Sequence, residues 1–211
     1  MLFRDRADAG NKLAAKLKHL TPENPIVLGL PRGGVPVAAQ VAKALDAPLD
    51  VIVVRKLGAP SNREFAMGAI GDGVEVLNDA TIRSLGVTAE QVQQVRIREQ
   101  KELTRRLERY RAGRPPLQLR GRTAVVVDDG IATGATAMAA CAVVRALGAA
   151  RVVLAVPVAP PNFDAGDTGD TVDEFICLER PAHFMAIGQW YTDFTQTTDD
   201  EVLRCLGEPS A

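Results

Sequence analysis

Short runs of aliphatic and β-branched residues alternate with helical patterns along the chain. Nearly every position in these runs is apolar, and they fall at residues 26–30, 51–54, 125–127, 152–156 and 175–178. Strands that are apolar on both faces are typical of a parallel sheet covered by helices on each side. The alternation therefore predicts an α/β fold with an open, mostly parallel sheet flanked by helices.

Helices and a hairpin are predicted between these runs. Apolar side chains recur at helical spacing in residues 9–20, 37–45, 92–110 and 133–147. Thr88 and Gln91 form a capping-box pattern that indicates the start of the third helix. Residues 65–70 and 74–77 flank a tight Gly-Asp-Gly turn, which predicts a β-hairpin, and residues 58–62 resemble a loop.

Composition excludes several classes of protein. The 211 residues are 46% hydrophobic and 24% charged, which is typical of a globular chain rather than a disordered one. Three widely spaced cysteines without a Cys-x-x-Cys pair argue against a zinc or thioredoxin-type site and favour a reducing compartment. Charge begins at Arg4, too early for a signal peptide, and no apolar run could span a membrane. We expect a cytoplasmic protein.

Charge is distributed unevenly, although the whole chain carries a net charge of only −1. Residues 96–122 hold ten Arg or Lys against three Glu, whereas residues 160–211 hold eleven acidic residues against two Arg. The basic stretch is consistent with a solvated helix face, with contacts between lobes or subunits, or with an RNA-binding surface. It lacks the interleaved aromatic residues that binding to single strands would use.

The stretch Val125–Thr136, V-V-V-D-D-G-I-A-T-G-A-T, carries the clearest chemical signal. An apolar strand ends in Asp128 and Asp129, a loop of small residues follows, and a helix then begins. Ligands of parallel α/β sheets bind at the carboxyl ends of strands. Adjacent carboxylates can accept hydrogen bonds from a vicinal diol, and the free N–H groups of a helix N-terminus favour a phosphate. The pattern therefore predicts a site for a phosphorylated sugar.

The phosphate is expected to contact the loop and the first helical turn, at Gly130, Ala132, Thr133, Gly134, Ala135 and Thr136. A Walker A loop is excluded because Gly134 is followed by alanine rather than lysine, and no G-x-G-x-x-G fingerprint is present. A plain helix-capping role for Asp128 and Asp129 is the structural alternative. Both carboxylates are expected to be reached by water, so replacing them with asparagine should leave folding intact.

At these residues the chain resembles the type I phosphoribosyltransferases. Their motif has four apolar residues, two acids, a few small residues and then T-G-x-T, with Ala124 as the fourth apolar position here. The resemblance extends from about Phe3 to Leu206 and is closest to a bacterial group with unassigned substrates. That group has similar L-P-R-G-G, R-K-L-G, E-x-A-x-G-A-I and G-Q-W-Y segments, here residues 30–34, 55–58, 64–70 and 188–191.

The resemblance implies a single phosphoribosyltransferase domain over residues 1–211. A hood would be formed by about residues 160–198, a helical insert by about 79–113, and a flexible loop by the hairpin region. The implied activity transfers the 5-phosphoribosyl group from phosphoribosyl pyrophosphate (PRPP) to a nitrogen nucleophile, a nucleobase or a related small molecule, and releases pyrophosphate. A homodimer is expected, without a membrane or nucleic acid partner. The alternative is a PRPP-sensing regulator of the same fold that binds RNA or a protein.

Residue roles follow from the same resemblance. Arg32, Gly33 and Gly34 correspond to the pyrophosphate loop, whose Pro31–Arg32 bond is expected to be cis. Arg55 and Lys56 begin the flexible catalytic loop, where two cations could neutralise charge growing on pyrophosphate. A plain turn and a solvated surface pair are the respective alternatives. Mg²⁺ is the expected cofactor, held mostly by PRPP oxygens and water, with Asp128 and Asp129 contacting it at most indirectly.

The acceptor side of the site is less defined. Glu64, Trp190 and Tyr191 are candidate acceptor-binding residues, the last two through stacking, although packing within the hood is an alternative for both aromatic residues. Enzymes of the family that act on 6-oxopurines have an aspartate just before the T-G of the motif. Ala132 occupies that position here, which argues against a 6-oxopurine as the acceptor.

Overall fold

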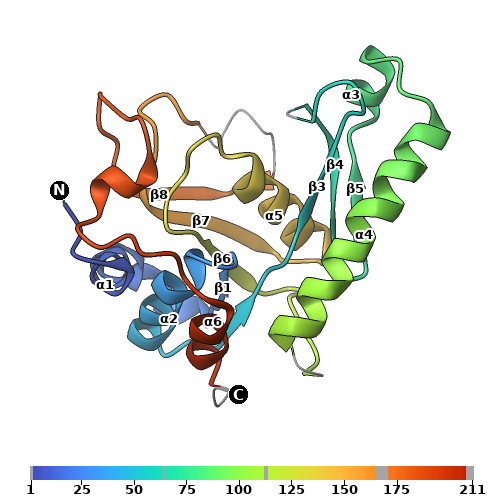
Figure 1. The fold of residues 1–211 in the computed structure, drawn as a ribbon. Helices are drawn as coiled ribbons and strands as arrows, with labels where there is room; N and C mark the ends of the chain where they lie inside the picture. The colour runs from blue at the N-terminus through green and yellow to red at the C-terminus, as the bar shows by residue number, and fades with distance from the viewer. Residues whose placement is uncertain (1, 64, 112–113, 165–170, 208–211) are drawn as a thin grey trace.

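Five parallel strands form the main sheet, in the order β2-β1-β6-β7-β8 (Figure 1). Their bounds are β1 Ile26–Gly29, β2 Leu49–Val51, β6 Thr123–Val127, β7 Arg151–Val158 and β8 Glu174–Glu179. Every neighbouring pair runs parallel, which confirms the expected open α/β sheet. The structure is a computed structural model, and it describes residues 2–63, 65–111, 114–164 and 171–207.

Alternating side chains of the central strands pack into two separate cores, one on each face of the sheet. Val125 and Val127 pack with α1 (Arg6–Leu17) and α2 (Gly34–Leu45) on one face of the sheet. Ala124 and Val126 pack with α5 (Ala135–Ala146) on the other face. A fully buried Val or Leu contributes about 1.5–3 kcal/mol, so β6, buried on both faces, is held firmly in the middle of the sheet. Its carboxyl end is therefore a rigid base for a site.

A second sheet of three antiparallel strands lies beside α5 (Figure 1). It consists of β3 (Arg55–Gly58), β4 (Ala66–Gly71) and β5 (Val74–Leu77), and the β4–β5 pair confirms the expected hairpin. The apolar run at residues 51–54 is expected from its sequence to form one strand of the main sheet. Only Val51 belongs to β2, because the following residues carry the chain across to β3 and divide their side chains between two cores.

The helical insert contains α3 (Asp79–Ser84) and the 23-residue α4 (Ala89–Arg111). The Thr88–Gln91 capping box is confirmed, since the Thr88 N–H donates to Gln91 Oε1 at 2.9 Å and the Gln91 N–H donates to Thr88 Oγ1 at 3.2 Å. Helix α4 packs against β3 and β4 on the side of the second sheet away from α5. Within the described ranges, no helix is long and apolar enough to cross a bilayer.

The segment 160–198, expected to form a hood, includes a strand of the main sheet, since residues 174–179 form β8. The same segment includes the 3-10 helix η3 (Ile187–Trp190), which packs on the N-terminal segment. The Phe3 N–H donates to the carbonyl oxygen of Trp190 at 2.8 Å, and Phe3 is fully buried. The first residues of the chain and the segment around η3 therefore pack together, and this cluster is called the hood below.

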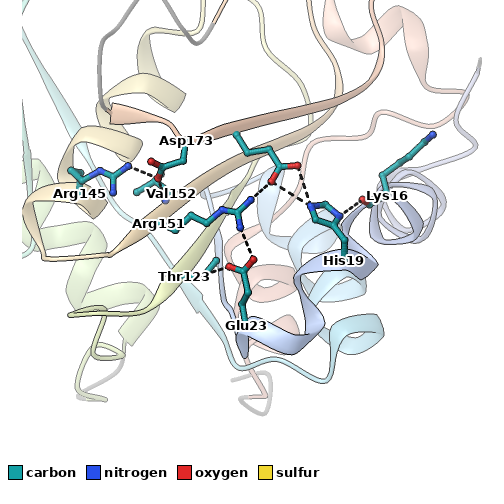
Figure 2. A network of polar contacts seen from close by, with 9 residues as sticks. Lys16, His19, Glu23, Thr123, Arg145, Arg151, Val152 and Asp173 are labelled. Atoms are coloured by element: carbon teal, nitrogen blue, oxygen red, sulfur yellow. Dashed lines mark hydrogen bonds and ion pairs between the residues drawn. The ribbon is translucent and has the colours of Figure 1, made fainter.

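A polar network ties the amino-terminal ends of β6, β7 and β8 to the 3-10 helix η1 (Lys18–Glu23) (Figure 2). Arg151 donates to Glu174 at 2.7 Å and also pairs with Glu23, which accepts a hydrogen bond from the Thr123 hydroxyl at 2.8 Å. His19 Nε2 lies 3.1 Å from Glu174 Oε1. These contacts lie at the sheet edge opposite the strand ends that carry the candidate site. The first helix is expected to continue to residue 20, but α1 ends at Leu17 and η1 begins at Lys18.

Candidate functional site

The two adjacent carboxylates at the end of β6 have different surroundings. Asp129 is 9% exposed, and Arg6 Nε donates to its Oδ2 at 2.8 Å. Arg6 is held in turn by the Thr195 carbonyl oxygen at 2.7 Å and by the Phe194 ring, whose centroid lies 4.1 Å away. The expectation that water reaches both carboxylates is wrong for Asp129, because a nearly buried ion pair fixes its side chain.

Asp128 is the less compensated member of the pair. Its Oδ1 accepts a hydrogen bond from the Asp129 N–H at 2.9 Å. Burial, and then the neighbouring Asp129 carboxylate, raise the pKa of Asp128 well above its ordinary value, and Arg6 offsets only part of this. Burial also raises the pKa of Asp129, with the Arg6 hydrogen bond opposing it. A ligand that donates hydrogen bonds to the ionised Asp128 carboxylate would offset this cost of ionisation.

The loop after β1 packs directly against the Asp pair. Its Pro31–Arg32 peptide bond is cis, as expected. A Cβ atom added at Gly34 would lie 2.6 Å from the carbonyl oxygen of Val127 and 2.8 Å from the Asp128 Cα. One added at Gly33 would collide with Asp129 Oδ2. The glycines are therefore required for the loop to reach β6, in addition to any role in approaching a ligand.

The small-residue loop after the Asp pair lines a cavity. Helix α5 begins at Ala135, and its N-cap is Gly134 with φ 79°, a left-handed conformation that favours glycine. A cavity of about 430 Å³ is lined by the loop and by the segment after β7, at Ala132, Thr133, Gly134, Ala135, Met138, Pro160, Asn162, Phe163 and Asp164. The first N–H groups of α5 lie at this loop, which is the arrangement that binds phosphate.

Phe163 is part of this loop region and was not identified by the sequence analysis. A Cβ atom added at Gly134 would collide with the Phe163 ring, so the ring rests on the loop. Phe163 packs edge-on against Phe175 of β8, with ring centroids 5.2 Å apart. No local pattern marks Phe163, because its position depends on the path of the chain after β7.

The predicted cations lie on different elements. The Arg32 side chain is directed toward α6 (Asp199–Cys205), with its Nη1 3.8 Å from Asp199 Oδ1. Arg55 of β3 donates to Glu99 of α4 at 2.7 and 3.0 Å. Lys56 follows it on the same strand, partly buried. Arg55 is therefore part of the packing between β3 and α4 rather than a solvated surface residue.

The structure changes the predicted role of one of the acceptor-binding candidates. Tyr191 is 5% exposed, its ring packs between Phe3 and Phe194, and its hydroxyl donates to the Asp129 carbonyl oxygen at 2.6 Å. Stacking of a base on Tyr191 is therefore wrong, because its ring is already covered. Trp190 packs in the same hood cluster and is partly buried. Glu64 lies outside the described residues.

Much of the basic stretch is neutralised within the molecule. Glu102 accepts hydrogen bonds from Arg105 at 2.9 Å and from Arg106 at 2.7 Å, which lowers its pKa to about 2. Arg109 lies 3.0 Å from Asp199, in the acidic C-terminal part of the chain. Ion pairs within α4 and between α4 and α6 therefore account for part of this charge, and the support that it gives to RNA binding is correspondingly weaker.

Comparison with known proteins agrees with this geometry. The family described as "Phosphoribosyl transferase domain" matches residues 3–174. A Mycobacterium tuberculosis (strain H37Rv) protein named "Putative phosphoribosyl transferase" is 57% identical over 206 residues, 97% of this chain and 46% of that protein. The chain thus spans about half the length of the curated relatives it matches. The crystal structure of TT1426 from Thermus thermophilus is 46% identical and superposes with a TM-score of 0.90 over 98% of both chains. The chain belongs to the phosphoribosyl transferase family and has its type I fold.

Proposed function

We propose that this domain transfers the 5-phosphoribosyl group of PRPP to a nitrogen nucleophile and releases pyrophosphate. The observation that carries the proposal is the placement of the poorly compensated Asp128 between two backbone cradles. One cradle is the N-terminus of α5 with its 430 Å³ cavity. The other is the glycine loop after β1, which contacts Asp128 and Asp129. A phosphorylated sugar with a hydroxyl pair and a diphosphate would match all three parts.

In the proposed reaction the chain acts mainly by positioning and by electrostatic stabilisation. Asp128 accepts hydrogen bonds from the ribose hydroxyls, and the first turn of α5 binds the 5-phosphate. The backbone N–H groups of Arg32 and Gly33 face the departing pyrophosphate, whereas the Gly34 N–H donates to the Leu30 carbonyl oxygen at 3.0 Å. Arg6 and Tyr191 act as positioning residues, since they hold the side chain and the backbone of Asp129.

The residues at the Asp pair are compatible with Mg²⁺, which prefers oxygen ligands and keeps several waters. Asp129 Oδ2 is already engaged by Arg6 at 2.8 Å, and Asp128 Oδ1 accepts the Asp129 N–H at 2.9 Å. Indirect contact through water therefore fits these carboxylates better than full coordination. When bound, the ion supplies positive charge that stabilises the pyrophosphate.

The acceptor is proposed to be a nucleobase or a related amine other than a 6-oxopurine, because Ala132 lacks a carboxylate at the proton-carrying position. The test is a screen of bases and amines with PRPP and Mg²⁺ in which released pyrophosphate is measured. Release that requires one acceptor and is lost in Asp128→Asn supports the proposal. PRPP binding without release for any acceptor would support the sensing alternative instead. Gel filtration and cell fractionation test the proposed homodimer and its cytoplasmic location.

A further inference from the structure

The side chain of Asp199, the first residue of α6, lies beside the side chain of Arg32 in the loop after β1. Asp199 Oδ1 is 3.8 Å from Arg32 Nη1, and both residues line a pocket of about 390 Å³. The Arg32 side chain is 38% exposed, so a ligand can reach its guanidinium group. This loop is the one proposed above to face pyrophosphate, and a carboxylate at this place therefore bears on that site.

Two residues of α4 hold the Asp199 carboxylate in place. The Tyr110 hydroxyl donates to Asp199 Oδ1 at 2.7 Å, and Arg109 Nε lies 3.0 Å from Asp199 Oδ2. Burial, and then the hydrogen bond to Asp199, raise the pKa of Tyr110 to about 12, so the hydroxyl stays protonated at neutral pH and keeps donating. Both carboxylate oxygens are thus anchored to α4, and Asp199 has a fixed position beside Arg32.

The contact between Arg32 and Asp199 is weak by comparison. A separation of 3.8 Å is near the upper limit for an ion pair, and ion pairs between partly exposed side chains contribute little to stability. Guanidinium groups bind phosphate oxygens through paired, charge-assisted hydrogen bonds, which are shorter and stronger. A diphosphate can therefore take Arg32 from Asp199, whereas the carboxylate stays with Tyr110 and Arg109.

We infer that Asp199 is an autoinhibitory competitor for Arg32 that lowers the affinity of the PRPP site. The inference rests on the proposed function, because it requires Arg32 to bind the diphosphate part of PRPP. When PRPP binds, Arg32 exchanges the carboxylate for phosphate oxygens. After transfer the same carboxylate attracts Arg32 again, which favours the release of pyrophosphate. Asp199 acts through Arg32 and contacts neither the ribose nor the acceptor in this scheme.

The test is calorimetric titration of the full chain with PRPP and Mg²⁺, and separately with pyrophosphate and Mg²⁺. The variant is Asp199→Asn, which removes the charge and keeps an oxygen that can accept from the Tyr110 hydroxyl. Exposed ion pairs are weak, so freeing Arg32 should tighten the binding of both ligands by about two- to fivefold. A change that only loosened α6 would weaken binding and lower the thermal melt instead.

Asp200→Asn is the matched control, because it removes the same charge from the next residue of α6. The Asp200 side chain is 55% exposed and lies 3.7 Å from Arg109. Its removal should leave the affinity for PRPP unchanged.

A double-mutant cycle with Arg32→Gln then tests whether Asp199 acts through Arg32. Arg32→Gln alone should bind PRPP more weakly than the unmodified chain. Adding Asp199→Asn to that variant should give no further change in PRPP affinity, since the group for which the carboxylate competes is already absent.

Equal or weaker PRPP binding by Asp199→Asn would overturn the inference and leave the proposed transfer reaction standing. Equal tightening in Asp200→Asn, or in the Arg32→Gln background, would also overturn it, because a general loss of negative charge would then explain the gain. If the unmodified chain does not bind PRPP at all, the proposed function is refuted and the inference falls with it. The unmodified chain therefore distinguishes the two failures.

Discussion

Asp128 combines a cost to stability with a role in the proposed binding site. Its raised pKa means that ionisation is more costly in the folded chain than in the unfolded one. This cost is absent while both states are protonated, below the ordinary aspartate pKa of 3.8, and it grows as pH rises from that value to the raised pKa of the folded chain, above which it stays constant. Stability in the unmodified chain is therefore reduced at neutral pH relative to a chain without this charge.

The Asp128→Asn variant should consequently be more stable than the unmodified chain, and more so at pH ~8 than at pH ~4.5, since the ionisation cost grows with pH. It should also bind PRPP about 10–100-fold more weakly, because one charge-assisted acceptor is lost. Thermal melts at the two pH values and PRPP titrations measure both effects. If the variant melted at a lower temperature than the unmodified chain at the higher pH, the folded chain would stabilise ionised Asp128 rather than disfavour it.

Gly34 is required by packing, so Gly34→Ala should destabilise the protein by about 1–3 kcal/mol, the usual cost of overpacking. The added methyl group would meet the backbone of β6, which cannot move without disturbing the central sheet. Urea denaturation measures the loss. Gly73→Asn serves as the control, because nothing lies within 4 Å of its Cβ position and asparagine tolerates its φ of 73°. Equal losses in the two variants would contradict the packing argument.

Contacts between elements explain which parts of the site the sequence could predict. The strand-loop-helix at Val125–Thr136 is local, so its residue types reveal it directly. Arg6 and Asp129 are 123 positions apart, and only the docking of α1 beside the end of β6 brings them together. The same holds for Tyr191, whose buried hydroxyl supports Asp129 only because the hood folds over it. The boundary of β2 could not be predicted either, because the side chains of the apolar run at residues 51–54 divide between two cores.

The Arg6–Asp129 pair joins α1, β6 and the hood, so Arg6→Ala should destabilise the protein by about 3–5 kcal/mol, the usual cost of leaving a largely buried charge unpaired. Both side chains are 12% exposed. Arg4→Ala is a close control, since Arg4 is 80% exposed in its 3.5 Å pair with Asp8 and should cost at most about 1 kcal/mol. Chemical denaturation compares them. Similar losses would show that the pair does not hold the hood. The expectation that both aspartates can be replaced without effect on folding is thus limited to Asp128.

Across the whole molecule, the candidate site and the main ion-pair network lie at opposite ends of the parallel strands. The carboxyl ends of β1 and β6 carry the two adjacent aspartates, the cis peptide and the cavity at α5. The amino-terminal ends of β6, β7 and β8 carry the ion-pair network around Arg151 (Figure 2). Ligands of such sheets bind at the carboxyl ends, so the network at the other edge should contribute to stability alone.

This division predicts the outcome of Arg151→Ala. The change leaves Glu23 and Glu174 without their shared partner, and because the Arg151 side chain is 36% exposed the loss should be modest, about 1–2 kcal/mol. Distant and independent sites add in free energy, so PRPP affinity should stay within about twofold of the unmodified chain. Denaturation and PRPP titration of the same samples measure the two quantities. Weaker PRPP binding with an intact melt would mean that strain passes along β6 from one edge of the sheet to the other, and the two ends could no longer be treated as independent.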